Sequence, residues 1–227
     1  MRKGETTRQH IIEEAAPVFN RHGFGSTSMS ELMAVTGLEK GGIYRHFKSK
    51  EDLALEAFEH AVELIERARV ANLDSLASPM EKVEALVSRF VNARSPIPGG
   101  CPVFNAAVEH DDGNPKLRAK AREFFQRWVA QLAEWIQAAQ DQGEFSKLHR
   151  PKELATFLYC TLEGALIARN LLGSPEPLLA AERVLMDFLL TGRVRKKRRT
   201  KSTTTDSKNR ISKSTLRPHL RTRSTKK

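Results

Sequence analysis

Residues 26–50 read STSMSELMAVTGLEKGGIYRHFKSK, and this stretch carries the signals of two short helices joined by a tight turn. Ser28 and Glu31 have the spacing of a capping box, in which each side chain accepts a hydrogen bond from the other residue's backbone N–H group. They predict the start of a helix that ends just before Gly37. A second helix is expected over residues 40–47. Two short helices joined in this way are typical of a helix-turn-helix motif.

The second helix opens with two adjacent glycines, each of which costs about 1 kcal/mol relative to alanine in a helix interior. Ile43 and Phe47 are four residues apart, so both are expected to face the core. The opposite face carries Gly41, Arg45 and Lys48, with Tyr44 on its flank. Glycines on an exposed face let the backbone approach a partner closely, and the neighbouring cations favour a partner that bears phosphates. The pattern predicts contact with duplex DNA through the major groove.

Residues 5–190 show helical spacing of apolar residues throughout, without sustained alternation of period two, and therefore predict an all-α fold. Capping residues, N-terminal prolines and glycine stops predict the other helices. These span residues 5–22, 49–75, 78–94, 101–111, 114–141, 151–172 and 174–190. The last two are apolar on more than one face, so we expect them to be buried partly in the core and partly against another molecule.

The formal net charge of +11 is unevenly distributed along the chain. Residues 193–227 hold 15 Lys and Arg against one acid, a net charge of +14, whereas residues 1–192 hold 23 basic and 26 acidic residues, a net charge of −3. The basic segment has too few apolar residues to offset the entropy of ordering it, so we predict that it is disordered. It is either a nucleic-acid tether or a solvated extension, and the sequence favours neither. We expect a helix-turn-helix domain over residues 1–48, a larger helical domain over 49–192 and a tail over 193–227.

Several classes of function are disfavoured. The first residues contain no apolar run typical of a signal peptide, and no eighteen apolar residues follow one another, so we expect a cytoplasmic protein without membrane contact. The two cysteines exclude a disulfide framework and offer no metal-ligand spacing. No catalytic triad, paired carboxylates or phosphate-binding loop can be drawn. We predict a protein that is not an enzyme and holds no metal or cofactor.

Residues 23–53, GFGSTSMSELMAVTGLEKGGIYRHFKSKEDL, resemble the DNA-binding domain of the TetR family of bacterial repressors. The resemblance covers about residues 8–55 and implies a helix-turn-helix domain followed by a variable helical sensor and dimerisation domain. It also implies contacts with DNA. These are Thr27 and Tyr44 at phosphates, Lys40, Gly41, Gly42 and Arg45 at base edges or nearby backbone, and His46 and Lys50 on the sugar-phosphate of the far side. Lys48 joins them on the exposed face.

Two positions depart from the family's pattern. Met33 stands where alanine is usual, which affects the distance between the two helices, and Glu39 replaces the usual Ser or Thr cap of the second helix. A carboxylate at that cap suits the helix dipole but repels phosphate. Taken alone, Tyr44 would also fit a half-buried position in the core. His46, Lys48 and Lys50, taken alone, would also fit a solvated surface. Only their joint spacing favours a site for DNA.

The function that the resemblance implies is a homodimeric transcription regulator, a repressor released by a small-molecule inducer. A two-fold dimer presents its reading helices to successive major grooves roughly 34–36 Å apart, and the last two helices are expected to form the dimer contact. A ligand within residues 78–170 would shift the long helix that starts at Ser49 and change the spacing of the two reading helices. The alternative is a nonspecific nucleic-acid packaging protein that acts through its basic tail.

Four residues are candidates for sensing: Cys101, Phe104, Trp128 and Phe157. Cys101 follows two glycines and precedes a helix, where the dipole favours a thiolate, and we predict a lowered pKa and a thiol open to electrophiles or oxidants. The alternative is a small residue that packs at a helix start. The three aromatic residues predict noncovalent binding of a ligand, although Trp128 also fits a core position.

Overall fold

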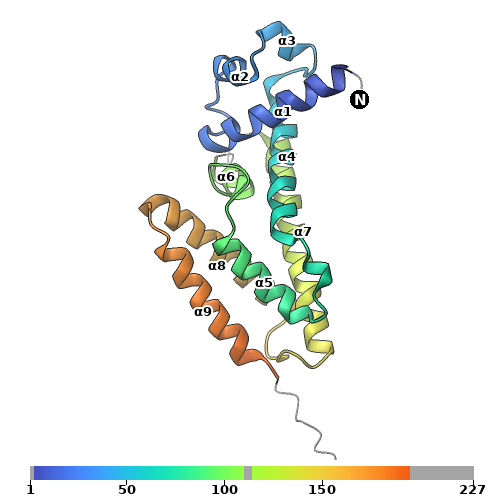
Figure 1. Cartoon of the computed structure of the whole chain (residues 1–227), viewed down its shortest axis with the longest axis vertical. Coiled ribbons are helices and arrows are strands. Elements are labelled where there is room, and N and C mark those ends of the chain that lie inside the picture. The colour runs from blue at the N-terminus through green and yellow to red at the C-terminus, as the bar shows by residue number, and fades with distance from the viewer. Residues whose placement is uncertain (1–2, 110–113, 195–227) are drawn as a thin grey trace, which may run out of the picture. The chain divides into compact units, whose positions relative to one another are not determined.

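The computed structural model describes residues 3–109 and 114–194, which belong to one compact unit. Within these residues the chain forms nine α-helices, one short 3-10 turn and no strand, which confirms the predicted all-α fold. The first four helices are α1 (Lys3–His22), α2 (Met29–Thr36), α3 (Lys40–Tyr44) and α4 (Lys50–Val70). In Figure 1, α1 crosses α4 near one end of the molecule, and α2 and α3 lie at that same end.

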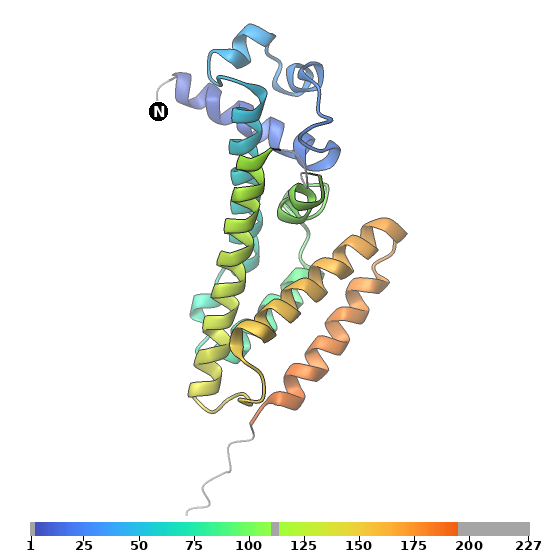
Figure 2. The same ribbon diagram turned by 180° about the vertical axis from the view of Figure 1, so that it is seen from behind.

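The remaining helices form a larger bundle. After the 3-10 turn η1 (Leu73–Ser75) come α5 (Pro79–Asn92), α6 (Pro102–Glu109), α7 (Pro115–Asp141), α8 (Pro151–Leu172) and α9 (Glu176–Gly192). Both views show α7 alongside α4, and α8 and α9 side by side as an antiparallel pair (Figures 1 and 2). None of the helices in the described ranges is both long enough and apolar enough to cross a membrane.

Side-chain caps fix the starts of the helices that the sequence predicted. Ser28 and Glu31 form the complete capping box of α2, with the Glu31 N–H donating to Ser28 Oγ at 3.2 Å and the Ser28 N–H donating to Glu31 Oε2 at 2.7 Å. Ser49 caps α4 in a similar way by accepting from the Asp52 N–H at 3.1 Å. Each such cap satisfies a backbone donor that the helix leaves unpaired.

Two hydrophobic clusters form the core. The first cluster contains residues from the first four helices, from α6 and from the start of α7. The second contains residues from α5, α7, α8 and α9. Phe58 of α4 is fully buried in the first cluster, where its ring makes edge contacts with Phe24 and Phe124 at centroid distances of 6.0 and 5.6 Å. Packing is therefore continuous across residue 49, because α4 serves both the helix-turn-helix and the bundle.

Two predicted helix ends differ from the structure by three residues or more. The regular part of α3 ends at Tyr44, and the chain continues to Phe47 as a turn whose N–H groups still bond to Ile43. Helix α4 ends at Val70 because Asn72 adopts a left-handed conformation with φ of 61°. The end predicted for the helix of 101–111 lies outside the described residues.

The start predicted for the tail also needs correction. Arg193 belongs to the folded unit, because its guanidinium binds Glu84 through Nε at 2.8 Å and through a second nitrogen at 2.5 Å. The Val194 N–H donates to the Glu144 carbonyl at 2.9 Å. These contacts were not visible in the sequence, since Glu84 and Glu144 are far away along the chain. The rest of the predicted tail, residues 195–227, lies outside the described residues.

Candidate functional site

The turn between α2 and α3 has the geometry that the sequence predicted. Gly37 adopts a left-handed conformation with φ of 67°, and its N–H closes the end of α2 by donating to the Met33 carbonyl at 3.0 Å. Ile43 and Phe47 are buried and pack against the core that also contains Leu32. The inward face of the second helix is therefore confirmed, and its other face is turned outward.

The outward face carries most of the residues predicted to contact DNA. Lys40, Gly41, Tyr44, Arg45 and Lys48 are exposed, whereas Gly42 and His46 are half-buried. The Tyr44 side chain is 40% exposed, with the Lys40 ammonium 5.9 Å from its ring centroid. This surface combines mobile cations with an aromatic hydroxyl, groups that suit phosphate and base edges.

The two glycines of α3 have different local roles. A Cβ built on Gly41 would meet nothing within 4 Å, so the fold itself does not require glycine there. A Cβ on Gly42 would touch Leu38 at 3.4 Å, a tight contact inside the motif. The backbone of α3 is therefore open to the outside at Gly41, and the close approach of a partner at this position stays a prediction.

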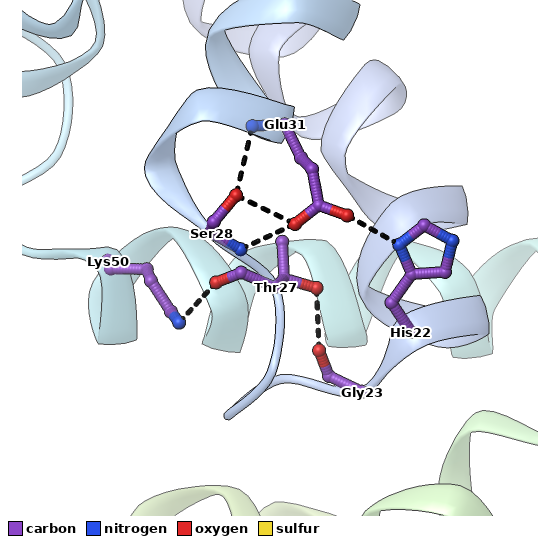
Figure 3. A network of polar contacts seen from close by, with 6 residues as sticks. All are labelled: His22, Gly23, Thr27, Ser28, Glu31 and Lys50. Atoms are coloured by element: carbon purple, nitrogen blue, oxygen red, sulfur yellow. Dashed lines mark hydrogen bonds and ion pairs between the residues drawn. The ribbon is translucent and has the colours of Figure 1, made fainter.

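Thr27 is a correction to the predicted DNA contacts. The residue is fully buried, and its hydroxyl donates to the Gly23 carbonyl at 2.6 Å (Figure 3). Its position at the loop before α2 explains the burial, because the side chain closes a turn between α1 and α2. Thr27 therefore shapes the motif and does not present a hydroxyl to phosphate.

Lys50 also has a structural role that the sequence did not reveal. Its ammonium donates to the Thr27 carbonyl (Figure 3) and to the Gly25 carbonyl, the latter at 3.0 Å, and so ties the start of α4 to the loop before α2. On the other side of this loop, His22 Nδ1 lies 2.9 Å from Glu31 Oε1 and links α1 to α2. Two of the three Lys50 donors are committed, so its main effect is to position α2.

A carboxylate from the bundle holds the same loop. Glu109, at the end of α6, accepts hydrogen bonds from the Phe24 N–H at 2.8 Å and the Gly25 N–H at 2.5 Å. Sequence reasoning missed this contact, because it joins residues more than eighty positions apart and a terminal helix glutamate is usually solvated. Glu39, the unusual cap of α3, makes no side-chain cap hydrogen bond.

The structure separates the four residues predicted to sense a ligand. The Phe104 and Trp128 rings both contact the Tyr159 ring, at centroid distances of 6.1 and 6.4 Å. Phe157 is 51% exposed and packs against Phe188 of α9 instead. Residues two apart on a helix do not share a face, so Phe157 cannot join the cluster around Tyr159. The prediction that Phe157 shares one ligand pocket with Phe104 and Trp128 is therefore wrong.

Little space remains inside this aromatic cluster. The gap beside Trp128, Tyr159 and Phe90 has a volume of about 10 Å³, too small for an organic ligand. Phe104 instead lines a groove of about 410 Å³ between α6 and α7. Trp128 is buried in the second hydrophobic cluster and fits the core position that the sequence left open.

The reactivity predicted for Cys101 is wrong in this structure. Cys101 is only 6% exposed. Its burial, together with the nearby charge of Glu163, raises the pKa of the thiol above its ordinary value. The dipole of α6 is too small to offset this burial, because desolvation of a charged sulfur dominates in an apolar site. Cys101 therefore fits the alternative of a small residue that packs at the start of a helix.

A buried acid lies beside this cysteine. Glu163 of α8 is fully buried, and neither of its carboxylate oxygens makes a hydrogen bond. The nearest cation is Arg69 of α4, with 3.6 Å between the guanidinium and Oε1, and the Arg69 guanidinium also covers the Phe90 ring at 3.9 Å from its centroid. Burial raises the pKa of Glu163, and Arg69 opposes the rise. A glutamate inside an otherwise apolar helix was the signal in the sequence that pointed to this site.

No group of three or more His, Cys, Asp or Glu side chains in the part of the chain that the structure describes is arranged to hold a metal ion. The outward face of α3 offers cationic side chains, an aromatic hydroxyl and backbone groups. These groups recognise a polyanion by charge and shape.

Comparison with known proteins agrees with this geometry. Residues 11–57 match the model of bacterial regulatory proteins of the tetR family, and residues 79–185 match the tetracyclin repressor-like C-terminal domain. Together the two matches cover more than half of the chain. The HTH-type transcriptional repressor DhaR of Mycobacterium sp. (strain GP1) is 26% identical over 184 residues, which are 81% of this chain and 92% of DhaR.

Solved structures agree as well. A TetR transcriptional regulator from Chloroflexus aurantiacus has a TM-score of 0.80 and 36% identity, over 85% of this chain and 98% of the regulator. A TetR-family regulator from Cytophaga hutchinsonii has a TM-score of 0.80 and 30% identity, over 86% of this chain and 99% of that protein. The chain belongs to the TetR family of DNA-binding transcriptional regulators.

Proposed function

We propose that this regulator is a cytoplasmic, non-enzymatic repressor that binds a pseudo-palindromic operator as a homodimer and leaves it when a small molecule binds the helical bundle. The observation that carries the DNA-binding part is the outward face of α3, where Lys40, Gly41, Tyr44, Arg45 and Lys48 are exposed beside a buried Ile43. Repression is supported by DhaR, which is named as a repressor.

The homodimer is supported by α8 and α9, which lie side by side (Figure 2). Both helices also expose large apolar side chains. These are Phe157, Ile167, Leu171, Leu172, Leu179, Val184 and Leu190, with Leu171 82% exposed. An exposed apolar surface of this kind marks an interface, and a second copy of the same two helices would cover it symmetrically. Two copies also serve recognition, because one short helix reads only a few base pairs.

The packaging alternative depends on the basic tail, and a truncation separates the two functions. We expect a protein that ends at Val194 to select one short pseudo-palindrome from a library of random duplexes. Its affinity for that site should exceed its affinity for a scrambled duplex, because the α3 surface is intact. Tyr44→Ala in the same protein should weaken the selected complex, while the free energy of unfolding in urea stays unchanged. Equal binding of all duplexes by the truncated protein would favour the packaging function.

A further inference from the structure

An open cleft of about 1150 Å³ lies in the described part of the chain. It lies where the C-terminal ends of four helices meet, namely α1, α4, α5 and α8, and the segment 93–100 forms one of its walls. The cleft is distinct from the small gap beside Tyr159, although Arg69 and Phe90 line both.

The cleft is strongly cationic. Five arginines line it, and no carboxylate is among its described lining residues. They are Arg21, Arg69, Arg89, Arg94 and Arg169. Two acids contact lining residues and are already engaged, Glu163 with Arg69 at 3.6 Å and Glu182 with Asn92 at 2.8 Å.

Three of these arginines have no partner of their own. Arg89 donates to the carbonyls of Arg69 and Ala71, and Arg69 faces Glu163. The side chains of Arg21, Arg94 and Arg169 make no hydrogen bond or ion pair within the described ranges and are exposed. Guanidinium groups that line one cleft without counter-charges favour an anion, because each offers planar donors for a carboxylate or phosphate.

Apolar groups make up the other part of the lining. Ile65, Phe90, Val91, Leu166 and Leu178 contribute to it, and Ile65, Phe90 and Leu178 are otherwise buried. A free inorganic anion would leave this surface wet. A ligand with an apolar body would cover it and gain roughly 25 cal/mol for each Å² of apolar surface removed from water.

We propose that the cleft binds an organic anion with an apolar body, whose acid group lies among Arg94, Arg169 and Arg21. The proposal rests on the proposed function, because it takes this ligand to be the inducer. Carboxylate and phosphate share the required chemistry, and the experiment below distinguishes them.

The cleft is connected directly to the DNA-binding end through its wall. Asn20 of α1 donates through Nδ2 to the Pro98 carbonyl at 2.7 Å and to the Gly100 carbonyl at 3.1 Å. Asn105 of α6 donates to the carbonyls of Gly99 at 2.8 Å and Asn20 at 3.1 Å. The wall and the end of α1 thus form one hydrogen-bonded unit, and Arg21 follows Asn20 directly.

A bound anion would therefore act on both helices that carry the motif. It would draw Arg21 at the end of α1 toward Arg169 of α8, and it would compete with Glu163 for Arg69 in the last turn of α4. A ligand shifts a conformational equilibrium only through contacts that differ between the two states. The groups placed to make such contacts are these arginines.

The test uses the full-length protein without DNA and four probes with the same eight-carbon chain: octanoate, octyl phosphate, octanol and octylammonium. Isothermal titration calorimetry measures the dissociation constant of each. We expect at least one anion to bind about tenfold or more tightly than octanol, the gain of a charge-assisted hydrogen bond. The tighter anion identifies the acid group. Equal affinity for octanol, tighter binding of octylammonium, or no binding of either anion overturns the proposal.

A pair of variants locates the binding. Arg94→Gln combined with Arg169→Gln removes two cleft cations that have no partner in the fold, and we expect it to abolish the preference for the anion. Lys152→Gln is the matched control, because Lys152 is an exposed cation on the same helix α8 and does not line the cleft. Unchanged anion affinity in the double variant, or an equal loss in the control, overturns the assignment.

Operator release is measured separately, by fluorescence anisotropy of the selected duplex. Anion binding with the expected variant pattern but without release supports the cleft and contradicts the inducer role. Release by the anions in the wild type but not in the double variant supports both.

Discussion

Glu163→Gln tests the description of the buried acid beside Arg69. In the native protein the carboxylate is fully buried, its oxygens make no hydrogen bond, and burial raises its pKa. In an unfolded chain a glutamate titrates near 4.3. The folded state therefore holds the Glu163 proton more tightly than the unfolded state does, and ionisation of the acid opposes folding.

The sign of the pH effect follows from this difference. As pH rises above the unfolded value, the wild type loses stability relative to the glutamine variant, because the folded protein must ionise a group in an apolar site. The free energy of unfolding of the variant minus that of the wild type increases by up to about 1.4 kcal/mol per pH unit, and this increase levels off above the folded-state pKa of Glu163.

Other groups near the carboxylate do not disturb this comparison. Cys101 and Tyr159 lie beside it, and burial raises the pKa of both, so that both remain neutral between pH 5 and about pH 8. Urea unfolding of wild type and Glu163→Gln at four pH values in this range gives the difference directly. Glu134→Gln, at an exposed position of α7, is the control. A variant-minus-wild-type free energy of unfolding that stays constant with pH, or decreases as pH rises, refutes the reasoning.

Three further predictions concern other contacts. Lys50→Ala should lower the free energy of unfolding by roughly 1–3 kcal/mol, because two loop carbonyls lose a charged donor; an unchanged urea midpoint contradicts this. Gly99→Ala should lower it by about 1–3 kcal/mol or more, since φ is 99° and the added Cβ would lie 2.5 Å from the Asn20 carbonyl oxygen; thermal unfolding at an unchanged temperature is the opposing result. Leu171→Glu should yield monomers by light scattering, whereas Leu148→Glu, at a similarly exposed site in a loop, should stay dimeric; dimers in both variants exclude this interface.

The sequence predicted those parts of the fold that depend on neighbours along the chain. The capping box of Ser28 and Glu31, the left-handed Gly37 and the inward Ile43 and Phe47 all rest on spacings of three or four residues, which one helix fixes by itself. The exposed face of α3 follows from the same spacing.

The errors arose where distant segments decide the environment of a residue. The helix dipole favoured a thiolate at Cys101, but α8 brings Glu163 against it and the bundle buries both. The family resemblance implied a phosphate contact for Thr27, yet its buried hydroxyl closes a turn to Gly23. The structure adds a second role for Lys50, whose ammonium binds the loop carbonyls, and its contact with DNA stays a prediction. Burial and partners of this kind cannot be read from local spacing, because they depend on packing between helices.

The segment SPIPGG at residues 95–100 contains two prolines and two glycines, which are typical of a chain segment that ends a helix. In the folded protein this segment has a second role that depends on distant residues. Gly99 adopts a φ that side chains rarely adopt, and it lies against the Asn20 carbonyl where no Cβ fits. The glycine thus lets the wall of the cationic cleft pack directly on the end of α1. A bulkier residue would separate the wall from α1 and break the asparagine contacts, while Arg94 and Arg169 could still bind an anion. Gly99→Ala should therefore reduce operator release more than it reduces anion binding, and an equal loss of both would mean that the wall is only part of the binding site.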